Sequence, residues 1–95
     1  MDIHLSENNV TITGNIKSIS DFQDIKQTID KTITNHKNII LHIKDSLSIT
    51  SSVIGYLNKL VLHDGININM NIHNEQLLGL LNDLNLSSTF NARKA

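Results

Sequence analysis

Cysteine is absent from this chain of 95 residues. Disulfide bonds, thiolate metal sites and a cysteine nucleophile are therefore excluded together. A large excess of charge of either sign is missing as well, because the formal net charge is −1 at pH 7. Without a basic surface there is no electrostatic reason to expect a nucleic acid or an anionic membrane as the main partner.

Long apolar runs and a basic leader are also missing. No segment approaches the ~18 consecutive apolar residues of a membrane helix, and the start from Met1 to Leu5 lacks the features of a secretory signal. We therefore expect a cytoplasmic protein without membrane insertion. The content of 39% hydrophobic and 18% charged residues is typical of a globular chain. Its length predicts a single domain over residues 1–95.

Strand signals occur at four places. Short β-rich segments stand at Ile3–Leu5 and Val10–Thr13, with polar residues between them and Gly14 after the second. The nearly continuous apolar run Ile39–Ile43 predicts a central strand covered on both faces. The segment 66–72 alternates isoleucine or methionine with asparagine, which predicts one buried and one solvated face.

Helix signals separate these strands. Ser20 and Gln23 have the spacing of a capping box before apolar residues at three- or four-residue steps. A second helix is predicted from about Ser51 to Leu62, ending at His63-Asp64-Gly65. A third follows Asn74, carries Leu77, Leu80, Leu81 and Leu84, and ends at Asn85. This order predicts an α/β fold, with a mixed sheet of four to five strands and helices packed mainly on one face.

The most informative feature is Thr50-Ser51-Ser52, at the start of the middle helix. Unpaired backbone N–H groups and the helix dipole favour an added negative charge there, such as a phosphate on Ser51 or Ser52. Alternatively, one of these hydroxyls only caps the helix. In either case Ser51 should lie at a helix start and be exposed to solvent.

One side of the middle helix is predicted to face a partner. At 100° per residue, the apolar residues from Val53 to Val61 gather toward the core. Gly55 either is tolerated on the exposed side or lets a partner approach closely. The residues expected to bind a partner are Thr50, Ser51, Ser52, Gly55, Asn58 and Lys59.

Catalytic, metal and cofactor sites are not expected. The chain has five histidines but no pair at i, i+4 spacing on a helix, so His42 and His73 are predicted to satisfy strand-end or core positions. Asp45-Ser46 and Ser87-Ser88-Thr89 are predicted turns. A glycine-rich loop with lysine, which cradles nucleotides, is also missing.

These residues together resemble the STAS domain, the fold shared by bacterial anti-sigma factor antagonists and by cytoplasmic domains of sulfate transporters. The resemblance spans essentially the whole chain. It depends on Gly14 after the second strand, the Ser51-Ser52-x-x-Gly55 helix start, Asp64-Gly65 before the alternating strand, and Leu84-Asn85-Leu86 followed by Phe90. In the antagonists the serine that follows an Asp is phosphorylated, which implies Ser51 here. Thr50 stands where the family has that Asp, and Val53 stands where it has Gly.

The resemblance implies a non-enzymatic regulator that acts by partner switching. Its implied partner is an anti-sigma factor with serine kinase activity, and the resemblance also allows a serine phosphatase as a second partner. Two alternatives stay open: an adaptor subunit that is not phosphorylated, and a domain that binds a nucleotide, a lipid or another small ligand at the same loop. With balanced charge and no long apolar patch, we expect a monomer or a weak dimer.

Overall fold

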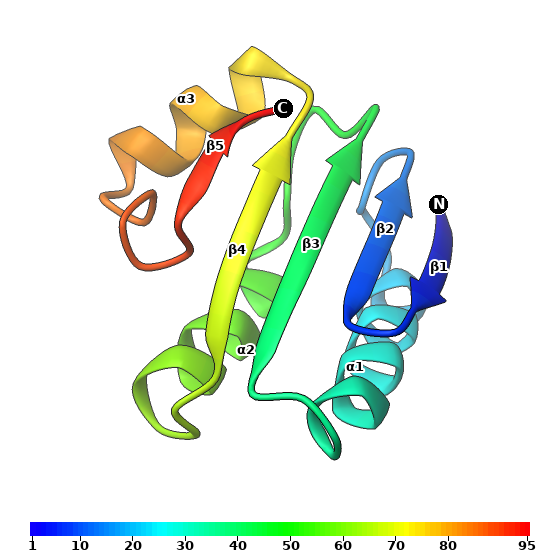
Figure 1. Ribbon diagram of the computed structural model, residues 1–95. Helices are drawn as coiled ribbons and strands as arrows, with labels where there is room; N and C mark the ends of the chain where they lie inside the picture. The colour runs from blue at the N-terminus through cyan, green and yellow to red at the C-terminus, as the bar shows by residue number, and fades with distance from the viewer.

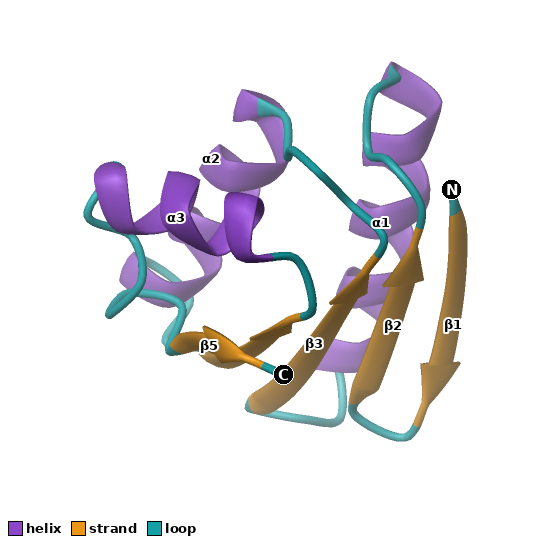
Figure 2. Ribbon diagram, turned by 90° about the horizontal axis from the view of Figure 1, so that it is seen from above, coloured by secondary structure: helices purple, strands orange, loops and turns teal.

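The computed structural model describes residues 1–95 as one five-stranded sheet with three helices. The strands lie in the order β1-β2-β3-β4-β5; β1 is antiparallel to β2 and the others are parallel. All three helices lie on one side of the sheet (Figures 1 and 2). The predicted α/β fold is confirmed. The elements are β1 (Asp2–Ser6), β2 (Asn9–Thr13), α1 (Ile19–Ile33), β3 (Asn38–Lys44), α2 (Ser51–Leu62), β4 (Asn67–Ile72), α3 (Glu75–Asp83) and β5 (Ala92–Lys94).

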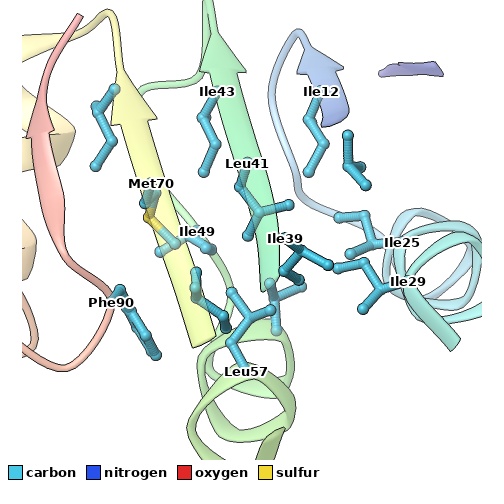
Figure 3. Packing of buried hydrophobic residues seen from close by; sticks show 14 of the residues in the cluster. Ile12, Ile25, Ile29, Ile39, Leu41, Ile43, Ile49, Leu57, Met70 and Phe90 are labelled. Carbon is cyan, nitrogen blue, oxygen red and sulfur yellow. The ribbon is translucent and has the colours of Figure 1, made fainter. Parts of the chain in front are cut away.

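The core lies between the sheet and the helices (Figure 3). It contains 19 buried apolar residues, drawn from every strand except the two edges and from all three helices. Ile39, Leu41 and Ile43 of β3 lie in the same apolar cluster as Ile25 of α1 and Leu57 of α2. None of the helices combines the length and apolar character that crossing a bilayer requires.

The two central strands each bury one face. In β4 the apolar residues are buried and the asparagines between them face the other side, as the alternation predicted. The prediction that Ile39–Ile43 is covered on both faces is wrong. Ile40 lies on the uncovered face, opposite Asn9 of β2 and Asn69 of β4, and is only half-buried. No helix covers this face of the sheet (Figure 2).

Helix α1 begins two residues earlier than the capping box predicted from Ser20 and Gln23. The residue that caps the helix is Ser18, whose Oγ accepts a hydrogen bond from the backbone N–H of Asp21 at 3.1 Å. The Asp21 carboxylate accepts from the backbone N–H groups of Lys17 and Ser18 in return. A carboxylate is a stronger acceptor than the Gln23 amide, which explains the choice. The bond from Lys17, with those from Ser18, holds the pKa of Asp21 below its ordinary value.

The chain after α3 contains an element for which no sequence signal was found. Helix α3 ends as predicted, with Asn85 in the left-handed region at φ 60°. Leu84, the last of the leucines predicted for this helix, caps its C-terminal end and is 49% exposed. Phe90 is then fully buried and β5 pairs parallel to β4, with Ala92 opposite Met70. Three residues without apolar alternation carry no strand signal, so only pairing with β4 makes them a strand.

Candidate functional site

The hydroxyls at the start of α2 have separate roles. Thr50 is the residue that caps α2, because its Oγ1 accepts a hydrogen bond from the backbone N–H of Val53 at 3.4 Å. Ser51 and Ser52 follow as the first two helical residues, and both are exposed. The structure thus confirms the predicted position of Ser51. It also assigns the capping function to Thr50, a residue type that is a preferred helix cap, and not to either serine.

The first turn of α2 carries no acidic residue, unlike the other two helices. Asp21 occupies that position in α1 and Glu75 occupies it in α3. The positive end of a helix dipole is stabilised by a negative charge in the first turn. A phosphate on Ser51 or Ser52 would supply the charge that α2 lacks, and no carboxylate within that turn would repel it.

The predicted partner-binding residues form a mostly exposed strip along α2, called the serine strip below. It consists of Thr50, Ser51, Ser52, Gly55, Asn58 and Lys59. Gly55 and Lys59 are exposed, as are the two serines, whereas Thr50 and Asn58 are half-buried at its sides. A Cβ atom built on Gly55 would meet no atom within 4 Å. No close packing within the chain requires glycine at this position. The space next to the serines is therefore open to a partner.

The loops that lead into α1 and α2 are joined by hydrogen bonds that the sequence did not predict. Ser46 is fully buried and its Oγ donates to the carbonyl oxygen of Gly14 at 2.5 Å. The backbone N–H of Leu47 donates to Oδ1 of Asn15 at 3.1 Å. These bonds connect the loop after β2 with the loop after β3, which leads to Ser51. Only the preference of serine and asparagine for loop hydrogen bonds could have indicated them.

Two exposed apolar side chains stand on the segments that lead into α1 and α2. Ile19, the first residue of α1, is 78% exposed, and Leu47 in the loop before α2 is 51% exposed. Both follow the carboxyl ends of parallel strands, β2 and β3 respectively. Exposed aliphatic side chains at the same end of the sheet as the serine strip offer a partner an apolar contact.

Tyr56, one turn after Ser52, connects α2 to α1. Its hydroxyl donates to Oδ1 of Asp30 at 2.5 Å, while Nζ of Lys26 lies 2.9 Å from Oδ2 of the same carboxylate. Lys26 also lies over the tyrosine ring, and Phe22 contacts that ring edge to face. Burial raises the pKa of Asp30, but the hydrogen bonds from Tyr56 and Lys26 outweigh it and lower the pKa below its ordinary value. Burial, and then the Asp30 carboxylate, raise the pKa of Tyr56.

Tyr56→Phe tests this connection through its pH dependence. We expect a loss of about 1 kcal/mol in the free energy of unfolding at pH 7, the usual net value of one hydrogen bond at a partly exposed site. Because the folded-state pKa of Asp30 is depressed, its contribution is present above the unfolded pKa of about 4 and is lost as the pH falls through the folded value. Urea unfolding of both proteins from pH 7 downward measures this; a difference that stays constant down to pH 3 would contradict it.

The histidines do not form a metal cluster with carboxylates. No group of three or more histidine, aspartate or glutamate side chains lies together. His42 lies in mid-strand on the uncovered face, where Nε2 is 3.0 Å from Oδ1 of Asn9 and Nδ1 is 3.5 Å from Nδ2 of Asn71. It thus occupies neither of the predicted positions, a strand end or the core. His73, directly after β4, is at a strand end as predicted.

Comparison with known proteins assigns no function to this site. No protein-family model matches the chain, and neither a curated protein nor a solved structure matches it.

Proposed function

We propose that this domain is a non-enzymatic regulator that switches between protein partners, controlled by phosphorylation of Ser51. The observation that carries the proposal is the separation of roles at the start of α2. Thr50 caps the helix, which leaves the exposed Ser51 hydroxyl without a structural function. That hydroxyl is accessible to a kinase. The resemblance to STAS-type anti-sigma factor antagonists supports the same role.

The switch is electrostatic in this proposal. The unmodified serine strip docks on a cytoplasmic serine kinase of the anti-sigma type, whose other client is then released. Phosphate adds about −1.5 to −2 charges and three acceptor oxygens to a surface that the kinase binds when Ser51 carries an uncharged hydroxyl. The helix dipole stabilises the phosphorylated start of α2, whereas binding to the kinase is lost. A serine phosphatase would restore docking.

A second candidate is an adaptor subunit that is never phosphorylated. The exposed side chains of Ile19 and Leu47 favour it, because an apolar contact of this kind would hold a partner without any change at Ser51. Under the adaptor hypothesis Ser51 is only the first residue of a helix that Thr50 already caps.

Intact-mass analysis of the protein isolated from its native host separates the two candidates. We expect a fraction that carries one phosphate, located by fragmentation at Ser51, or at the adjacent Ser52. Thr50→Asp restores the acidic neighbour of the acceptor and keeps a good cap, so it should increase that fraction.

Two control variants accompany this measurement. Ser51→Ala should abolish the phosphate, whereas Ser52→Ala should leave it in place if Ser51 is the acceptor. If phosphate is absent from both serines in all variants, including Thr50→Asp, the adaptor is the better assignment.

A further inference from the structure

The two edges of the sheet differ in how they are protected. β5 has three residues, and two of them are the cations Arg93 and Lys94. A short edge strand with positive charge is typical of edges that avoid pairing with other chains. β1 has five residues, and its single charged side chain is Asp2 at its end. Its outer edge thus presents backbone hydrogen-bonding groups with little to prevent pairing.

The β1–β2 hairpin determines which backbone groups point outward. Ser6 pairs with Asn9 across the two-residue turn Glu7-Asn8. The pair that closes such a turn exchanges backbone hydrogen bonds, and bonded and non-bonded pairs then alternate along the ladder. His4 therefore bonds to β2, as Ser6 and Asp2 do. Ile3 and Leu5 direct their N–H and C=O groups away from the sheet.

The side chains of β1 alternate between the two faces. Ile3 lies opposite Ile12, which is buried beneath the helices, so Ile3 and Leu5 point to the helix side. His4 lies opposite Thr11 on the uncovered face. Leu5 is 43% exposed although it is in register with the fully buried Val10. Covering Leu5 would remove apolar surface from water.

We propose that β1 pairs antiparallel with β1 of a second copy of this chain, with His4 on the twofold axis. Ile3 of each copy then lies opposite Leu5 of the other, and each such pair exchanges both outward backbone hydrogen bonds. Asp2 lies opposite Ser6, so no like charges meet. The contact involves only β1 of each copy. Ser51 begins α2, which follows β3, and β3 lies two strands away from β1 in the sheet. Dimerisation is therefore separate from the proposed switch.

Two five-residue strands form a small interface, so the dimer is weak and depends on concentration. The register is testable because the chain contains no cysteine, and each single cysteine variant has one thiol. His4 faces its own copy as a non-bonded pair, with Cα atoms about 4.5 Å apart, within the range of a disulfide. Ser6 lies on the same face but about 14 Å from its own copy.

We expect His4→Cys to convert largely to a disulfide dimer under mild oxidation at pH 8, measured by non-reducing electrophoresis. Ser6→Cys should form at least tenfold less in the same time, like the exposed collision control Ser88→Cys. Equal cross-linking of His4→Cys and Ser6→Cys, or none by His4→Cys at millimolar concentration, would overturn the proposal.

Sedimentation of the native protein and of two lysine variants provides an independent measurement. The native average mass should rise with concentration. Leu5→Lys should stay monomeric, because it places a cation at the pairing edge, whereas the matched control Leu62→Lys, at a side chain 66% exposed, should associate like the native protein. A folded Leu5→Lys variant that associates normally would contradict the register. If Leu5→Lys does not fold, the cross-linking of His4→Cys compared with that of Ser6→Cys decides whether β1 pairs as proposed.

Discussion

Ser51→Asp is expected to weaken binding to the physiological partner by at least about tenfold, which corresponds to about 1.4 kcal/mol. Under the proposed switch, the partner binds a surface with an uncharged Ser51 hydroxyl. A carboxylate would bring one charge into that interface, and desolvating the charge without a counterion is unfavourable. Phosphate, with nearly twice the charge, should act more strongly. Isothermal titration against the protein that co-purifies with the native chain measures both.

The fold should not suffer from this change. Aspartate in the first turn of α2 supplies the acidic residue that this helix lacks, so stability should be unchanged or up to about 1 kcal/mol higher. A loss of binding together with intact stability is the signature of a switch. Ser51→Ala should bind like the native protein, because Thr50 continues to cap the helix.

Ser88→Asp is the matched control for added charge. Ser88 is also exposed but lies in the turn segment before β5, away from the start of α2. It should bind normally. If Ser51→Asp also binds like the native protein, partner switching is wrong and the adaptor assignment replaces it.

Phe90→Ala is expected to cost about 3–5 kcal/mol in the free energy of unfolding, the usual cost of removing a buried aromatic ring. Phe90 is fully buried and belongs to the core cluster (Figure 3). It precedes β5 by two residues, so its ring anchors the segment that brings this strand to β4. Against a total stability of about 5–14 kcal/mol for a domain of this length, the loss would be large.

Urea unfolding monitored by circular dichroism measures the Phe90→Ala effect. Leu84→Ala is the control from the same part of the chain, because Leu84 is 49% exposed and should cost less than about 1 kcal/mol. Similar small losses for both variants would show that the C-terminal segment does not depend on the aromatic anchor.

Much of the candidate site could be predicted because its determinants are local. Three neighbouring polar residues before an amphipathic segment indicate a helix start, and their order places Ser51 just inside it. Likewise, Gly65 and Asn85 adopt the left-handed backbone predicted for residues that follow a helix. The exposed serines could therefore be located without knowledge of the fold, whereas the sequence alone could not decide which hydroxyl caps the helix.

The sequence by itself determined the order of the first four strands and the three helices, the α/β class and the exposed position of Ser51. Each depends on spacing along the chain, which is visible in a window of a few residues. Only the tertiary structure decided that Ser46 bonds to Gly14, that Tyr56 reaches Asp30, and that Ala92–Lys94 form a strand. These contacts join residues far apart in sequence, so they depend on how the sheet and helices pack and carry no local signal.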